Sequence, residues 1–146
     1  MSMSRDFLAQ WFRYVKVWWY FVVPVLVWMG VIFLLSSQPA FGTGSASLSL
    51  GQFLLRKGAH VAEYFVLGVL LFRMFRYFFP QSSHMTAAGV VLVSLPFALS
   101  DEIHQLFVSG RQGRVSDVGI DAIGIFLSLI FCLVILPWWR KRESQL

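Results

Sequence analysis

The chain has 146 residues, of which 58% are hydrophobic and 13% are charged. Soluble domains carry about 45–50% apolar and about 25% charged residues, so this balance excludes a water-soluble fold of this size, and it also excludes a disordered chain. The single Cys excludes an internal disulfide and every multi-cysteine zinc or iron–sulfur motif, and the formal net charge is +5.

The composition favours one small domain embedded in a membrane. About 20 helical residues are needed to cross about 30 Å of hydrocarbon. The first candidate span, residues 17–35, contains no charge and follows a basic N-terminal segment. Its apolar run is long for a signal peptide and no A-x-A-like site follows it, so we expect an uncleaved span with Pro24 as a point of kinking.

Three further candidate spans follow a Ser/Gly-rich loop over residues 36–52. The second span, residues 58–79, is less purely apolar because it carries charged side chains along its length. The third, residues 85–107, contains a proline and becomes polar at its C-terminal end, and the fourth covers residues 118–139. We therefore predict an all-α integral membrane protein with four transmembrane helices threaded up-down-up-down.

The basic residues indicate how this thread is oriented. With the N-terminus inside, eight Lys and Arg residues lie on the inner side and four on the outer side. Because cytoplasmic loops carry an excess of Lys and Arg, we expect a multi-pass protein of the cell membrane with both termini cytoplasmic. The positive net charge then requires no nucleic-acid partner.

Polar residues gather at one end of the predicted bundle. The thread brings together the start of the second span, the end of the third and the start of the fourth, whichever side is outside. An ionisable group inside the hydrocarbon costs roughly 2.5–3.5 kcal/mol or more unless it is paired or hydrated, so this layer indicates a functional site. Its members are Lys57, His60, Glu63, Tyr64, Asp101, Glu102, His104, Gln105, Asp117 and Asp121.

Helical spacing of about 100° per residue places these groups on defined faces. On the third span, Asp101, Glu102 and Gln105 share one arc, whereas His104 lies to its other side. On the fourth span, one narrow stripe includes a glycine that permits close approach of another helix. That stripe consists of Asp117, Asp121, Gly124 and Ser128.

Three stretches resemble the VanZ-like family of small bacterial membrane proteins: LSSQP at 35–39, KGAHVAEYFVLG at 57–68 and SDEIHQLFVSGRQGRVSDVGIDAIG at 100–124. The resemblance implies a single VanZ-like transmembrane domain over residues 1–146. Many relatives have Asn where this chain has Asp121. The name-giving member is associated with low-level resistance to the glycopeptide teicoplanin, which implies a ligand in the cell envelope. The positions that match the family pattern are Lys57, His60, Glu63, Tyr64, Glu102, Gln105, Arg111, Asp117, Asp121 and Gly124.

The functional hypothesis is an outward-facing polar pocket that binds an anionic lipid or a lipid-linked cell-envelope component, with chemical modification of that ligand left open. Arg side chains suit bidentate contacts to phosphate. The anion would be held by Lys57, Arg111 and Arg114. Any proton transfer would fall to His60, Glu63 and Glu102. The remaining contacts to the ligand would come from Tyr64, Gln105, Asp117 and Asp121.

Other interpretations stay open. Imidazole and carboxylate groups suit zinc, manganese or iron, so His60 and Glu63 could bind a metal. Further ligands would be Glu102 or His104 from the third span and Asp117 or Asp121 from the fourth. No recognised metal motif is present, and we assign no metal and no cofactor. Buried polar pairs could also hold the helices of a non-catalytic module that alters glycopeptide access, and buried acids could serve a small proton-coupled transporter. The expected partners are membrane lipids, including a lipid-linked envelope precursor.

Overall fold

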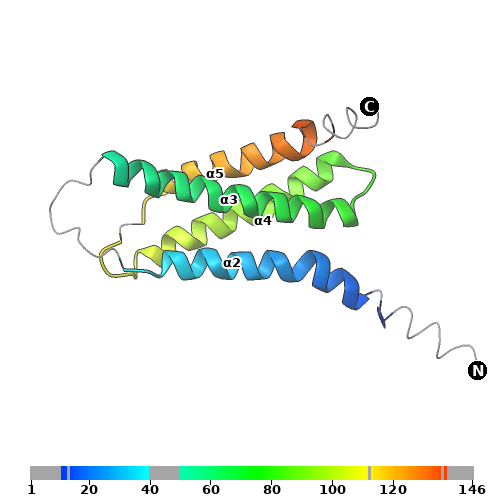
Figure 1. Ribbon diagram of the computed structural model, residues 1–146, viewed down its shortest axis with the longest axis horizontal. Coiled ribbons are helices and arrows are strands. Elements are labelled where there is room, and N and C mark those ends of the chain that lie inside the picture. The colour runs from blue at the N-terminus through cyan, green and yellow to red at the C-terminus, as the bar shows by residue number, and fades with distance from the viewer. Residues whose placement is uncertain (1–10, 13, 40–49, 112, 136, 138–146) are drawn as a thin grey trace, which may run out of the picture.

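The computed structural model describes residues 11–12, 14–39, 50–111, 113–135 and 137, and these ranges are helical without any strand (Figure 1). Four helical segments are long and apolar enough to cross a membrane: Tyr14–Ser36, Leu54–Phe78, Ser83–Gln105 and Val115–Ile135. The four predicted spans and the all-α class are thereby confirmed. The predicted end of the fourth span falls partly on Leu136, Trp138 and Trp139, which lie outside the described residues.

The helices run alternately in opposite directions, as predicted (Figure 1). In chain order they are the π-helical turn η1 (Trp18–Val22), α2 (Val23–Ser36), α3 (Leu50–Phe78), α4 (Ser83–Gln105), α5 (Val115–Ile130) and the π-helical turn η2 (Phe131–Ile135). The C-terminal ends of α2 and α4 and the N-terminal ends of α3 and α5 therefore lie at one end of the bundle, and η1 and η2 lie at the other.

The closest helix contact joins α3 to α5 and depends on small residues. A Cβ atom added to Gly124 would lie 2.4 Å from the carbonyl oxygen of Val61, and one added to Gly68 would lie 2.0 Å from the Oγ atom of Ser128. Without Cβ atoms at these positions the two backbones approach closely, as small residues allow between helices in membranes. The predicted role of Gly124 is confirmed, and α3 supplies a second glycine to the same contact.

Pro24 changes the start of the first span. A proline has no N–H to donate to the carbonyl four residues earlier and its ring crowds that carbonyl, so the preceding turn widens into η1. The carbonyl oxygen of Tyr20, four residues before Pro24, instead accepts a hydrogen bond from Nη2 of Arg73 at 2.9 Å. The Arg73 guanidinium also lies 5.3 Å from the centre of the Phe21 ring, which joins α3 to the first span.

The apolar core runs between the four helices and is thin, because each helix also presents large apolar side chains on the outside. A bilayer accounts for this arrangement, since lipid solvates the outer apolar face while the core packs within. The core contains Val25, Ile32, Tyr64, Leu67, Leu71, Val90, Ala98, Ile125 and Leu129.

Candidate functional site: a buried polar cluster at one end of the bundle

The predicted polar layer exists, and it lies at the end of the bundle where α3 and α5 begin and α2 and α4 end (Figure 1). We call it the polar cluster and define it by the polar residues that contact one another there, together with Glu63 and Arg111, which line the pocket beside them. The members named from the sequence are Lys57, His60, Glu63, Glu102, Gln105, Arg111, Arg114, Asp117 and Asp121. Asp101, which was also named from the sequence, belongs to it, and Ser36 of α2 completes it.

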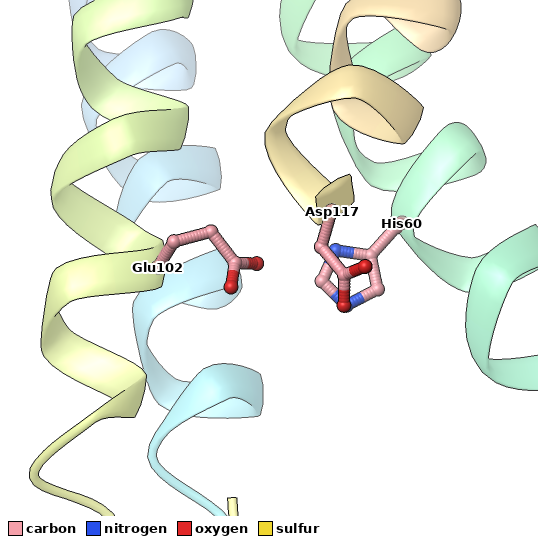
Figure 2. Close-up of side chains that lie close together, drawn as sticks. All are labelled: His60, Glu102 and Asp117. Carbon is pink, nitrogen blue, oxygen red and sulfur yellow. The ribbon is translucent and has the colours of Figure 1, made fainter. Parts of the chain in front are cut away.

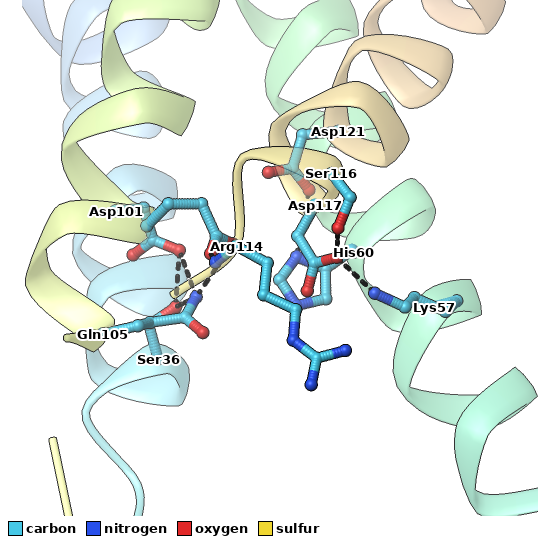
Figure 3. A network of polar contacts seen from close by, with 10 residues as sticks. Ser36, Lys57, His60, Asp101, Gln105, Arg114, Ser116, Asp117 and Asp121 are labelled. Carbon is cyan, nitrogen blue, oxygen red and sulfur yellow. Dashed lines mark hydrogen bonds and ion pairs between the residues drawn. The ribbon is translucent and has the colours of Figure 1, made fainter. Parts of the chain in front are cut away.

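Two polar contacts connect α3 to α5 within this cluster. The Nδ1 atom of His60 lies 3.0 Å from Oδ1 of Asp121, and both side chains are buried. One helical turn closer to the end of the bundle, Nζ of Lys57 pairs with Oδ1 of Asp117 (Figure 3). The Oγ atom of Ser116 donates a hydrogen bond of 3.2 Å to the same Asp117 oxygen. The stripe predicted for the fourth span therefore faces α3.

A second group connects α4 to α2. The Oγ atom of Ser36 donates to Oδ2 of Asp101 at 2.7 Å, and Nε2 of Gln105 donates to the same oxygen at 3.0 Å. The Gln105 amide also lies 3.3 Å from Oε1 of Glu102. Asp101, Glu102 and Gln105 are all buried on one face of α4, which confirms the arc predicted from their spacing.

The loop between α4 and α5 closes over this group. Gly110 has a φ of 75°, a conformation that glycine adopts without steric cost, and it turns the chain back toward the bundle. A Cβ atom on Gly113 would lie 2.2 Å from the carbonyl oxygen of Glu102, so the loop packs directly on α4. This close approach lets the backbone N–H of Arg114 donate to Oε2 of Glu102 at 2.9 Å.

Arg111 joins the same loop to the end of α2. Its Nε atom donates to the carbonyl of Gln38 at 3.1 Å, and its Nη2 atom donates to the carbonyl of Leu35 at 2.9 Å. The last carbonyls of a helix lack partners within the helix, so Arg111 stabilises the C-terminal end of α2. A guanidinium has five N–H donors, so other donors of Arg111 remain for a ligand.

A pocket of about 110 Å³ opens beside the polar cluster. His60 and Glu63 of α3 lie on one wall, and Arg111 lies on the wall formed by the loop. Arg56, one of the four basic residues counted on the outer side from the sequence, contributes a second guanidinium. The complete lining is Leu35, Ser36, Arg56, Ala59, His60, Glu63 and Arg111.

The structure brings His60 together with one of the two metal-ligand candidates from each of the third and fourth spans. One ligand atom each of His60, Glu102 and Asp117 lies within 4.8 Å of the other two, and all three side chains are buried (Figure 2). They come from three different helices, α3, α4 and α5. Glu63, the first partner considered for a metal in the sequence analysis, does not belong to this group and faces the pocket instead.

Two residues of the predicted layer, Tyr64 and His104, are not part of the pocket lining. Tyr64 is fully buried beside Phe97, 6.3 Å between ring centres, and its hydroxyl has no hydrogen bond within the described part of the chain. His104 points toward α2, where it stacks on Phe33 with ring centres 4.1 Å apart and Nε2 lies 3.0 Å from Oγ of Ser37. Tyr64 therefore does not line the pocket, and His104 is separate from the His60 group.

The sequence analysis missed the contribution of the first span. Ser36 is buried and donates to Asp101, and Ser37 contacts His104, so all four helices take part in this end of the bundle. The available signal was the Ser-Ser-Gln run that ends an otherwise apolar span, where hydroxyl groups at a helix end can bond across helices. The sequence contains no such signal for Arg56, because a single Arg near the end of a span is as typical of a topology anchor as of a binding site.

The fold and the cluster define a class of protein: a four-helix integral membrane protein with a buried, charged polar cluster at one end. The sequence profile of the VanZ/LLP1 family matches residues 21–136, which include the helices α2 to α5 and every residue of the cluster. The chain therefore belongs to the VanZ/LLP1 family. No curated protein sequence and no solved structure matches the chain significantly.

Proposed function

We propose that the chain binds an anionic lipid or a lipid-linked cell-envelope component, and that it holds the phosphate of this ligand in the pocket beside the polar cluster. The observation that carries the proposal is that two guanidinium groups, of Arg56 and Arg111, line a pocket of about 110 Å³ together with His60. Guanidinium groups recognise phosphate through paired hydrogen bonds. A lipid headgroup at this end of the bundle would enter the pocket while its acyl chains remain in the bilayer.

Arg111 is suited to this role because it is already ordered. Its two hydrogen bonds to carbonyls of α2 fix the guanidinium at the pocket wall before any ligand arrives. A preorganised side chain loses less conformational entropy on binding, which strengthens the contact. Lys57 and Arg114 lie in the cluster itself, where Lys57 pairs with Asp117. We therefore propose Arg111 and Arg56 as the main phosphate contacts, with Lys57 and Arg114 adding positive potential.

The contact between His60 and Asp121 supports a second candidate function, proton transfer to a bound ligand. A carboxylate that accepts from Nδ1 fixes the imidazole in one tautomer and leaves Nε2 able to take a proton. Glu63, which lines the same pocket, and Glu102 are the carboxyl groups that could exchange protons with it. A binding role without chemistry would require only the anion contacts.

We further propose that the pocket faces the outside of the cell membrane, with both termini cytoplasmic. The excess of Lys and Arg on the opposite side supports this orientation, eight against four. Family resemblance supports the envelope ligand, because the name-giving member is associated with teicoplanin resistance. A ligand among the lipid-linked cell-wall precursors would connect the pocket to that phenotype.

The test is lipid binding by the purified chain in nanodiscs of phosphatidylcholine. We expect native mass spectrometry to detect one added polyprenyl phosphate per chain, and we expect Arg111→Gln to weaken binding at least tenfold. Arg76→Gln is the matched control, since Arg76 lies at the opposite end of the bundle. Equal binding by wild type and Arg111→Gln, or equal loss in both variants, would contradict the proposal. Binding that survives in Glu63→Gln while ligand turnover stops would favour the proton-transfer role.

A further inference from the structure

We infer that His60, Glu102 and Asp117 form a binding site for one divalent transition metal ion, of the zinc or manganese class. A donor set of one imidazole and two carboxylates is the type that such ions prefer. Three protein ligands leave further coordination positions for water or for an oxygen of a bound molecule. This inference does not depend on the proposed lipid ligand, although an ion at His60 would lie at the wall of the same pocket.

The geometry brings the donor atoms close together before any ion is bound. The three atoms lie within 4.8 Å of one another, in a group contributed by three helices (Figure 2). Ligand atoms about 2.1 Å from a tetrahedral ion lie about 3.4 Å apart, so the site closes by movements of roughly 1 Å. Rotations of the Glu102 and Asp117 side chains supply movements of this size without any shift of the helices.

Each of the three groups is held by a partner of the kind that orients metal ligands. The carboxylate of Asp121 lies 3.0 Å from Nδ1 of His60, which leaves the Nε2 lone pair for an ion. Glu102 accepts hydrogen bonds from the backbone N–H of Arg114 and from Gln105. Asp117 accepts one from Ser116 (Figure 3). Carboxylate oxygens have two lone pairs each, so these bonds leave room for metal coordination.

The charge of the cluster is a second, independent observation. The residues Asp101, Glu102, Asp117 and Asp121 are all buried, with exposed fractions of 2%, 4%, 7% and 0%. One oxygen of Asp121 and one of Asp101 have no hydrogen-bond partner within the described ranges. Several carboxylates buried together are unfavourable unless cations compensate their charge. A divalent cation between His60, Glu102 and Asp117 supplies that compensation.

Lys57 is the competitor for this position. Its ammonium group contacts Asp117, and its side chain is 19% exposed, so it can move outward along its flexible stem. A divalent ion that coordinates Asp117 would weaken or displace this ion pair. Lys57→Gln should therefore raise the affinity for the metal severalfold, whereas removal of a metal-coordinating side chain should lower it.

The experiment uses the full chain, purified in detergent and stripped with a chelator, then titrated with ZnCl₂ or MnCl₂ in calorimetry. We expect one ion per chain, confirmed by elemental analysis after desalting. Loss of one metal-coordinating side chain should weaken the binding of the metal ion at least tenfold in His60→Ala, Glu102→Gln and Asp117→Asn. His104→Ala is the matched control, because His104 lies at the same end of the bundle but stacks on Phe33. Binding below one tenth of an ion per chain, or equal binding in all variants, would overturn the inference.

A spectroscopic measurement guards against variants that simply fail to fold. Co²⁺ bound to His60 and two carboxylates should give visible d–d absorption bands in the wild type, and His60→Ala should lose them while keeping its helical circular dichroism. Bands that persist in folded His60→Ala would overturn the inference. Arg111→Gln should bind metal normally, so loss of lipid binding and loss of metal binding are measured separately, and either proposal can fail alone.

Discussion

The Nδ1 atom of His60 and the Oδ1 atom of Asp121 lie 3.0 Å apart between α3 and α5, and the Asp121 side chain is fully buried. This contact connects the packing of the two helices to the chemistry of the site. Gly124 lies one turn after Asp121 on the same stripe, and it brings α5 close enough to α3 for the pair to form. The orientation of the His60 ring is thus a consequence of how closely the two helices pack.

Asp121→Asn should preserve the orientation of His60, because the amide oxygen can replace the carboxylate oxygen as acceptor. Asp121→Leu should remove the tautomer preference, since no acceptor then faces Nδ1. The measurement is ¹⁵N NMR of the histidine rings in micelles, in which wild type and Asp121→Asn should both show His60 protonated at Nδ1. An unchanged His60 signal in the folded Asp121→Leu variant would contradict this role for Asp121.

Gly124→Ala should destabilise the bundle by about 1–3 kcal/mol, because the new Cβ would lie 2.4 Å from the Val61 carbonyl and backbone atoms must shift. Gly119→Ala is the matched control on the same helix, since a Cβ there meets nothing within 4 Å. Unfolding in mixed micelles, followed by circular dichroism, compares the two variants. Equal stability of both variants would show that close packing of α3 on α5 does not limit the fold.

Helical periodicity predicted much of this site from the sequence. The stripe from Asp117 to Ser128 and the arc from Asp101 to Gln105 both depend on spacing within one helix, and both face inward as expected. The approximate span boundaries could be predicted because the length of an apolar run is a local property of the chain. These features require no knowledge of how the helices pack.

Features that depend on packing between helices could not be predicted. Whether Ser36 reaches Asp101 depends on the lateral position of α2, about which the apolar sequence of the first span says little. The burial of Tyr64 follows from its place on the face of α3 that packs against Phe97. Likewise, the group of His60, Glu102 and Asp117 depends on the relative depth of three helices, which spacing within each helix does not determine.

Ser36→Ala should destabilise the protein by about 1–3 kcal/mol, because Asp101 then keeps one donor fewer in a buried position. The control is Ser100→Ala, since Ser100 is exposed and its hydroxyl bonds only within its own helix, to the carbonyl of Phe97 at 2.7 Å. Thermal unfolding in detergent measures both. A Ser36→Ala variant as stable as Ser100→Ala would mean that α2 contributes no net stability through this contact.

The proposed orientation predicts which loops a membrane-impermeant maleimide reaches in intact cells. Ser109→Cys lies in the loop beside the polar cluster and Gln81→Cys in the loop at the opposite end, and both positions are exposed. In a Cys132→Ala background, which removes the single native Cys, we expect Ser109→Cys to be labelled in intact cells and Gln81→Cys only after permeabilisation. The reverse pattern would place the pocket in the cytoplasm. A ligand displayed on the outer surface of the membrane would then have no access to Arg111, and the proposed link to envelope precursors would have to move to their cytoplasmic forms.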